Sequence, residues 1–195
     1  MLFHAIITAA FLTGTPAPTP GTAASPCVRM EDEVPVAGRQ SRLDSVSIRI
    51  NNKEIKVCYG RPSLKGRVML GGEAVPFGKL WRTGANEPTM IHTDLPLTIA
   101  GIRVEPGTYS LYTVPGASEW EIIVNRAIKQ WGHESTYTPE VKAQEVGRGK
   151  VKPTTLTMPV ETFAISLTPP ADGKTSIVLD WQATRVSIPV TIEAK

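Results

Sequence analysis

The residue types best suited to chemistry gather between positions 59 and 87. The candidates in this stretch are three arginines, a tyrosine, a tryptophan, an amide and a carboxylate, at Tyr59, Arg61, Arg67, Trp81, Arg82, Asn86 and Glu87. Guanidinium groups bind carboxylates and phosphates through paired hydrogen bonds, and a flat indole ring suits sugar or peptide surfaces. These residues therefore form a candidate groove for an anionic or polyhydroxyl ligand.

A loop accounts for most of this stretch. Residues 60–86 follow neither a helical nor a strand period, which predicts one long ordered loop, and such loops are functional more often than connective. In the alternative interpretation, the arginines fix the loop internally by pairing with carbonyls and with carboxylates such as Glu87, Asp94 and Asp180. The residue types do not decide between a loop that forms a ligand groove and a loop that is an internal plug.

Signatures of known catalytic centres are missing from this sequence. It has no GxSxG turn, and His133-Glu134 lacks the second histidine of a zinc-binding HExxH helix. A hydrolase or lyase acting on an extracellular or envelope polymer is an alternative, with Glu87 as acid or base and Arg82 stabilising negative charge. We assign no catalytic residue, metal or cofactor, and favour a non-enzymatic binding module for a cell-envelope glycan or peptide.

The four tryptophans fall into two pairs. Trp120 and Trp181 share strand parity with aliphatic residues, which predicts that both lie in the core. Trp81 and Trp131 lie in irregular segments, where exposure and contact with a ligand are expected.

Alternating apolar residues predict about nine strands around these candidates. Ile48 and Ile55 begin the pattern, and a two-residue turn at Asn51 and Asn52 pairs them across a β-hairpin. The other strand candidates are residues 89–94, 97–99, 102–105, 108–114, 120–125, 163–167, 177–181 and 186–192. Strands that each have one apolar face predict an all-β protein, an antiparallel β-sandwich.

Two features modify this pattern. Thr138 precedes Pro139 and an acidic residue, as at a helix start, and Gly147 would end the helix, so one short helix is expected. Pro189 has no backbone N–H to donate, which predicts that the last strand lies at a sheet edge or carries a bulge.

Composition limits the number of domains and the kinds of partner. The chain has 195 residues, 41% of them hydrophobic, which suits a single core. Its 21 basic and 18 acidic side chains give a net charge of +3, and the basic residues are scattered. Nucleic acid is not an expected partner, because a phosphate backbone requires a concentrated basic patch.

The N-terminal sequence predicts export to the periplasm or beyond. Residues 2–12 are an apolar stretch of signal-peptide length, too short to span a membrane, and Thr22, Ala23 and Ala24 form a cleavage site. We expect a signal peptide at 1–24, a linker or tail at 25–42, and the β-sandwich domain at 43–195. No transmembrane segment is expected in the mature chain.

The two cysteines fit an oxidising compartment. Cys58 alternates with Val57 and Tyr59, so its side chain points to the other face of the strand, and a disulfide to Cys27 would tie the tail to the domain. Lipid attachment at Cys27 is disfavoured because Pro26 stands where lipidation motifs carry a small flexible residue. Two free thiols are the remaining alternative.

Four motifs resemble a known family. The segments YGRPS (59–63), KGR (65–67), PFGKLWRTGANE (76–87) and PGTYSL (106–111) are similar to a bacterial family catalogued as domain of unknown function 2911 (DUF2911). The resemblance covers about residues 45–193. It implies an exported β-rich domain and brings no reaction, cofactor or catalytic residue with it.

Overall fold

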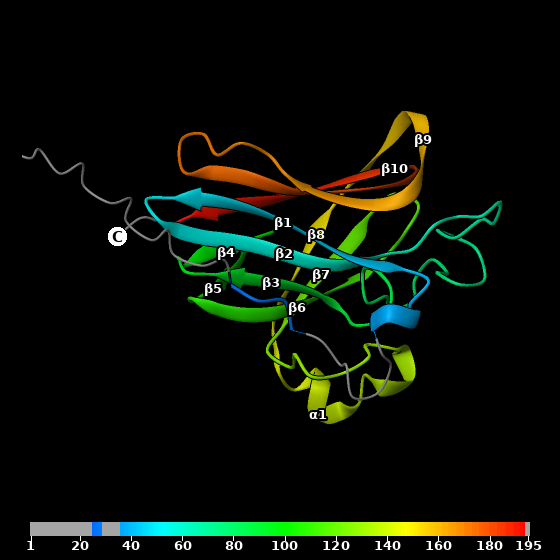
Figure 1. The fold of residues 1–195 in the computed structure, drawn as a ribbon, viewed down its shortest axis with the longest axis horizontal. Helices are drawn as coiled ribbons and strands as arrows, with labels where there is room; N and C mark the ends of the chain where they lie inside the picture. Colours follow the sequence, from blue (N-terminus) through cyan, green and yellow to red (C-terminus); the bar gives the residue numbers. More distant parts are fainter. Residues whose placement is uncertain (1–24, 29–35, 194–195) are drawn as a thin grey trace, which may run out of the picture.

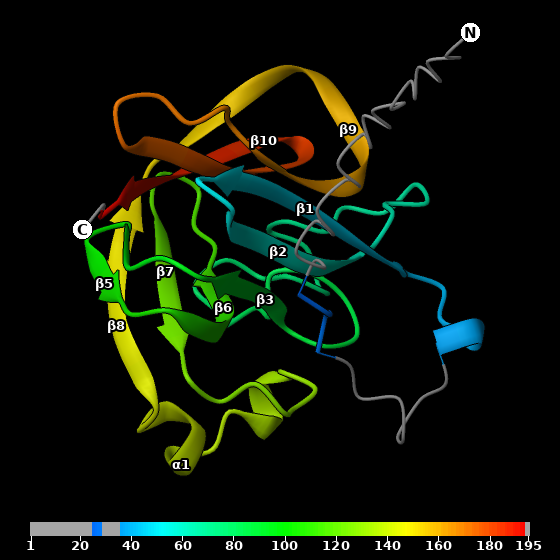
Figure 2. The same cartoon turned by 60° about the vertical axis from the view of Figure 1, so that its left-hand side comes forward.

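The chain folds into two antiparallel β-sheets packed face to face, in a computed structural model that describes residues 25–28 and 36–193 (Figures 1 and 2). The expected signal peptide lies outside the described residues. Ten strands form the sheets, where about nine were expected. They are β1 (Arg42–Ile50), β2 (Lys53–Arg61), β3 (Thr89–Thr93), β4 (Leu97–Ile99), β5 (Ile102–Val104), β6 (Gly107–Val114), β7 (Trp120–Asn125), β8 (Glu145–Val151), β9 (Pro153–Leu167) and β10 (Lys174–Ile192).

The strand order confirms the all-β sandwich. One sheet has six strands in the order β1-β2-β3-β6-β7-β8, and the other has four in the order β5-β4-β10-β9. In Figure 1, β9 and β10 lie across β1 and β2, and α1 (Pro139–Lys142) lies at the opposite end of the molecule. The facing sides of the sheets bury a continuous apolar core, with Val57, Ile91 and Leu111 from one sheet and Leu179 and Ile188 from the other.

The first hairpin follows the expected register. Ile48 pairs with Ile55 across β1 and β2, and both turn residues, Asn51 and Asn52, adopt positive φ angles. Asparagine tolerates this left-handed backbone region better than most residues, and consecutive positive φ angles suit the right-handed twist of a tight hairpin.

The expected helix starts where predicted but ends early. The Thr138 side chain accepts a hydrogen bond from the Val141 amide, and α1 stops at Lys142. Gly147 is therefore not the helix stop, because it lies within β8, which the sequence did not predict. A side chain at Gly149 would meet the Ala100 carbonyl oxygen at 2.1 Å, so the inward face of β8 carries glycine where alternation would show an apolar residue.

The last two expected strands are one strand, β10. Gln182, with φ +52°, forms the irregularity between its two halves, and its side-chain oxygen accepts the amides of Met69 and Leu70 at 2.7 and 2.6 Å. The strand is not at an edge, but Pro189 lies beyond the last residue paired with β9, Val186, so its missing N–H interrupts no ladder there.

Two short 3-10 turns complete the described elements, Val36–Gly38 before β1 and Glu134–Thr136 before α1. Within residues 25–28 and 36–193, no helix is long and apolar enough to cross a membrane.

Candidate functional site

The expected loop runs between β2 and β3, at residues 62–88, and we call it the arginine loop. It folds back over the end of the sandwich, where Trp81 and Thr113 exchange two backbone hydrogen bonds of 2.7 and 2.9 Å. A side chain at Gly60 would meet the Ala85 carbonyl oxygen at 2.1 Å, so glycine lets the loop pass directly over β2. The loop is thus fixed to both β2 and β6.

Trp81 is a core residue, which corrects the expectation that it would be exposed. It is only 6% exposed, stacks on Trp181 with ring centroids 5.6 Å apart, and meets Trp120 and Phe163 edge-on. Its indole N–H donates to the Gly84 carbonyl at 3.1 Å. Because tertiary contact through the β6 bridge overrides the irregular local sequence, Trp81 anchors the arginine loop. Trp120 and Trp181 lie in the core as expected.

Arg82 connects the arginine loop to a second segment of the chain. Its Nη1 atom donates to the carbonyls of Asn86 at 2.9 Å and Trp131 at 3.0 Å, which ties the arginine loop to the segment before α1. Its Nε and Nη2 atoms donate to nothing in the part of the chain that the structure describes. Burial lowers the pKa of Arg82, and the negative charge of Glu87 opposes this shift. The guanidinium is therefore held in place with donors to spare.

Glu87 is committed to a partner that the sequence did not suggest. Arg39 Nη1 lies 2.7 Å from both carboxylate oxygens, and the side chains of Arg39 and Glu87 are 2% and 5% exposed. The Arg39 guanidinium also lies over the half-buried Trp131 ring, 5.4 Å from its centroid. Arg39 belongs to the stretch expected to be a linker, and nothing in its local sequence indicates this long-range pair.

The remaining candidates are separate from one another. The Tyr59 hydroxyl donates to the Ile165 carbonyl inside the core, where burial raises its pKa. Arg61 donates to the Phe163 carbonyl and pairs with Asp44 at 2.9 Å, so it links β2 to β9 and β1. Arg67 is exposed and donates to carbonyls of its own turn, while the Asn86 side chain donates to the Ser41 carbonyl. The three arginines therefore do not converge.

An open cleft of about 360 Å³ lies between the arginine loop and the segment before α1. Trp81 and Arg82 are the predicted residues that line it. The lining also contains charged or titratable side chains that were not assigned to the groove, namely Glu73, Lys79, His133 and Glu134. Figure 2 shows the segment before α1 as the short turns beneath the sheets. The sequence does not indicate this grouping, because the arginine loop and the segment before α1 are far apart along the chain and meet only in the folded protein.

Charges in the cleft are unevenly cancelled. Lys79 and Glu134 form an exposed pair at 3.6 Å, and Arg39 occupies both oxygens of Glu87, the carboxylate that acts on Arg82. The positive charge of Arg82, with a smaller effect of burial, lowers the pKa of His133, which favours the neutral imidazole. Glu73 lies exposed at the rim. The cleft therefore presents the half-buried Arg82 guanidinium and the exposed His133 imidazole, a setting that suits an anionic group.

Among residues 25–28 and 36–193, no three histidine, cysteine, aspartate or glutamate side chains are grouped so as to hold a metal ion. His92 lies away from His133, on β3, and its ring nitrogens lie 3.0 Å from the Thr108 hydroxyl and 3.3 Å from Asp94 Oδ1.

Comparison with known proteins gives a family and no activity. A family model described as "Protein of unknown function (DUF2911)" matches residues 41–190, which confirms the resemblance carried by the sequence motifs. No curated protein and no solved structure matches the chain.

Proposed function

We propose that this chain, which belongs to the DUF2911 family of proteins of unknown function, is an exported binding module. Its ligand is a polar molecule with an anionic group, such as the end of a cell-envelope glycan or peptide, held in the cleft beside Arg82. The observation that carries this proposal is the Arg82 guanidinium, fixed through Nη1 while Nε and Nη2 have no partner within the described residues. A guanidinium fork that is already oriented binds a carboxylate or phosphate with little loss of side-chain entropy.

The cleft walls favour a ligand that also has apolar or ring surface. Trp81 and Trp181 line the cleft together with Val75 and Leu80, beside the charged side chains. Small-molecule sites commonly combine such apolar walls with a few polar groups that fix orientation. Sugar rings with a carboxylate, and short peptides with a free carboxyl end, both have this combination.

Export is supported by the cysteines. Cys27 and Cys58 form a disulfide, with Cα atoms 5.8 Å apart. Disulfides persist in the periplasm and outside the cell and are rare where thiols are kept reduced. The apolar stretch at residues 2–12 supports the same compartment.

A second candidate function is hydrolysis or elimination on an envelope polymer, and His133 is the observation that favours it. A neutral imidazole at the cleft can accept a proton, and Arg82 lies near enough to lower its pKa. Glu87, the expected acid or base, is instead buried against Arg39. If this candidate is correct, His133→Gln abolishes turnover and preserves the fold.

A third candidate is a purely structural arginine loop. Trp81 in the core, the Arg39–Glu87 pair and the carbonyl contacts of Arg61 and Arg67 all support it for most of the loop. A purely structural loop gives no role to the Arg82 guanidinium or to the open cleft.

A thermal-shift screen of the mature domain tests the three candidates. The probes are soluble peptidoglycan fragments, envelope glycans, acetate and inorganic phosphate. We expect at least one probe to raise the melting temperature by about 5 °C or more at 100 times its Kd. Arg82→Ala should abolish this shift.

Arg67→Ala is the matched control. Arg67 lies in the same loop, donates hydrogen bonds to no described residue outside its own turn, and does not line the cleft. If Arg82→Ala does not fold, Arg82→Lys keeps the charge without the fork and should weaken binding. Equal shifts in wild type, Arg82→Lys and Arg67→Ala would overturn the proposed site. No shift with any probe, together with a large loss of melting temperature in Arg82→Ala, would favour the structural loop.

A further inference from the structure

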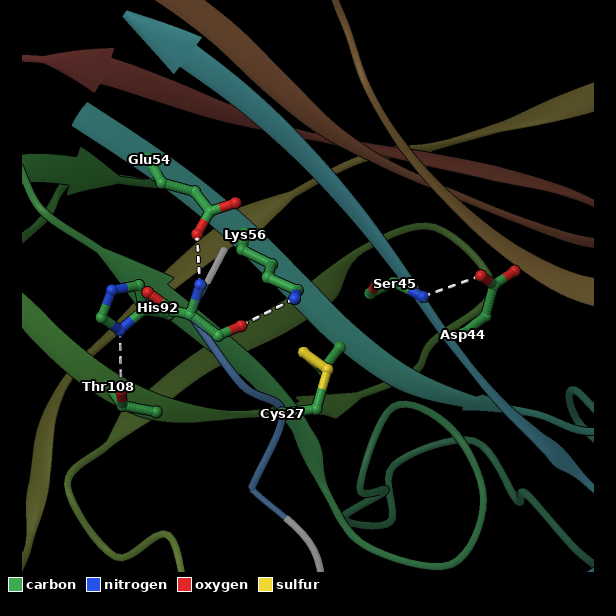
Figure 3. Close-up of a disulfide and its surroundings, with 9 residues drawn as sticks. Cys27, Asp44, Ser45, Glu54, Lys56, His92 and Thr108 are labelled. Carbon is green, nitrogen blue, oxygen red and sulfur yellow. Dashed lines mark hydrogen bonds between the residues drawn. A yellow bond between two sulfur atoms is a disulfide. The ribbon is translucent and has the colours of Figure 1, made fainter. Parts of the chain in front are cut away.

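A short N-terminal segment is attached to the outer face of the six-stranded sheet. Residues 25–28 are joined to β2 by the Cys27–Cys58 disulfide, and the Lys56 ammonium donates to the Ser25 carbonyl at 2.7 Å. Figure 3 shows Cys27, Lys56 and Glu54 around this segment. These contacts fix the position of the Ser25 nitrogen.

Glu54 faces that nitrogen with a carboxylate that is only partly satisfied. The residue is 3% exposed, and its Oε2 atom accepts the Ser25 backbone N–H at 2.8 Å. Its Oε1 atom is buried and has no hydrogen-bond partner, and no cation pairs with Glu54 among residues 25–28 and 36–193. A buried carboxylate is costly when a single neutral amide serves it, so such sites normally contain a positive charge.

We propose that Glu54 is the binding site for the α-ammonium group of the mature protein, with Ser25 as its first residue. The structure places the Ser25 nitrogen within hydrogen-bond distance of Glu54, and removal of residues 1–24 would make that nitrogen charged. An ammonium group has three N–H donors, where the amide has one, so it can serve Oε1 as well as Oε2.

The covalent step is hydrolysis of the Ala24–Ser25 peptide bond by a signal peptidase. The C–N bond breaks, the hydroxyl of water joins the Ala24 carbonyl carbon, and the Ser25 nitrogen takes the remaining hydrogen. At neutral pH the new amine takes up one further proton, since an α-amino group has a pKa of about 7.7–8.0. Thr22, Ala23 and Ala24 supply the small residues that such a peptidase requires.

The register leaves little freedom in the position of this cleavage. One residue of extended chain spans about 3.3 Å, and the disulfide at Cys27 holds the segment in place. Cleavage one residue earlier would leave an amide at Ser25 and move the ammonium away from Glu54. The backbone of Glu54 is fixed as well. The Asp94 N–H donates to the Glu54 carbonyl, and the Glu54 N–H donates to the side-chain Oδ2 of Asp94, both at 2.9 Å.

This inference depends on the export part of the proposed function and not on the ligand of the cleft. The precursor would have an unbalanced Glu54 carboxylate, and the mature chain would have a buried ion pair. Cleavage of the precursor therefore stabilises the folded domain, and it does so only outside the compartment where the chain is made.

N-terminal sequencing of the protein secreted from the full-length precursor is the first test. The proposal expects a single N-terminus at Ser25. An N-terminus at any other residue, or an uncleaved chain, would overturn it. Probe binding at the cleft is measured separately, so failure here and failure of the binding proposal are distinguishable.

The second test compares two oxidised forms released from a fusion protein, one that begins at Ser25 and one that retains Ala24. We expect the form that retains Ala24 to melt at least about 6 °C lower, the effect of losing a buried charge partner in a domain of this size. In the Glu54→Gln background the two forms should melt at the same temperature. A difference of the same size with and without the Glu54 carboxylate, or no difference in the wild type, would contradict the proposal.

Discussion

Glu87 in the arginine loop and Glu54 on β2 are both nearly inaccessible, at 4% and 3% exposure, but their charges are handled differently. Arg39 Nη1 donates to both oxygens of Glu87. Glu54 accepts one neutral N–H, from Ser25, and its other oxygen has no partner in the described part of the chain. Among the described residues, a cation pairs with Glu87 and none pairs with Glu54.

Two residues of the segment expected to be a linker or tail contact these carboxylates. Both Arg39 and Ser25 belong to residues 25–42, and each serves a buried carboxylate on the six-stranded sheet side of the protein. Arg82 is the cationic counterpart of Glu54, since it has donors that no described residue uses. Incomplete pairing of a fixed charge is therefore the common sign of the two proposed sites.

Arg39→Ala should have the largest effect on stability, because it removes the charge partner of Glu87. It leaves Glu87 buried without its guanidinium, which we expect to lower the free energy of unfolding by about 3–5 kcal/mol. Urea unfolding measures this loss. Arg103→Ala is the control, because Arg103 is exposed and pairs at the surface with Glu105 and Glu193, so its loss should change stability by less than about 1 kcal/mol. Similar losses in the two variants would show that the Arg39–Glu87 pair has no special role.

Loss of the Cys27–Cys58 disulfide should free Ser25 from its position at Glu54. Cys27→Ser removes a crosslink between residues 31 positions apart, which we expect to cost about 3–4 kcal/mol by the chain-entropy argument. It should also remove the difference in melting temperature between the Ser25 and Ala24 forms, because Ser25 is no longer held at Glu54. Differential scanning calorimetry of both forms gives the two quantities. A difference that persists in Cys27→Ser would mean that the disulfide does not position Ser25.

His133 should have a smaller effect, on how stability depends on pH. Since Arg82 lowers the pKa of His133, the unfolded chain binds a proton more readily than the folded one between the folded pKa and about 6.5. The stability from this residue is fully present above pH 6.5 and is lost as the pH falls through that window. NMR titration should show the His133 pKa rising toward 6.5 in Arg82→Gln. An unchanged pKa would indicate that the Arg82 charge is already cancelled.

Local sequence signals predicted the elements that local interactions form. Asn51 and Asn52 gave the hairpin register and Thr138 gave the helix start, because each acts on neighbours within a few residues. Strand β8 was missed because its inward positions, including Gly149, are filled by another part of the chain instead of by apolar side chains. The burial of Trp81 and the pairing of Arg39 with Glu87 depend on contacts between distant segments, which periodicity does not report.

The candidate site was also predicted only as far as local sequence allows. The sequence located Arg82 and the loop that contains it, because a cluster of arginines in a stretch without periodicity can be recognised from the sequence alone. It did not group His133 or Lys79 with Arg82, because the cleft forms only when the loop packs against the segment before α1. It also grouped Tyr59, Arg61 and Arg67 with the site, which the structure separates from the cleft.

The Arg82 Nε–H signal in NMR spectra of the mature domain, followed during a titration with inorganic phosphate, tests the proposed site most directly. Arg67 is an internal reference, because its Nε already donates to the Leu64 carbonyl at 3.0 Å. We predict a saturable shift of the Arg82 signal and little change at Arg67, because Arg82 Nε has no partner among the described residues and Arg67 Nε is already engaged. Equal, unsaturable shifts of both signals, or no shift of Arg82, would contradict an anion site in the cleft.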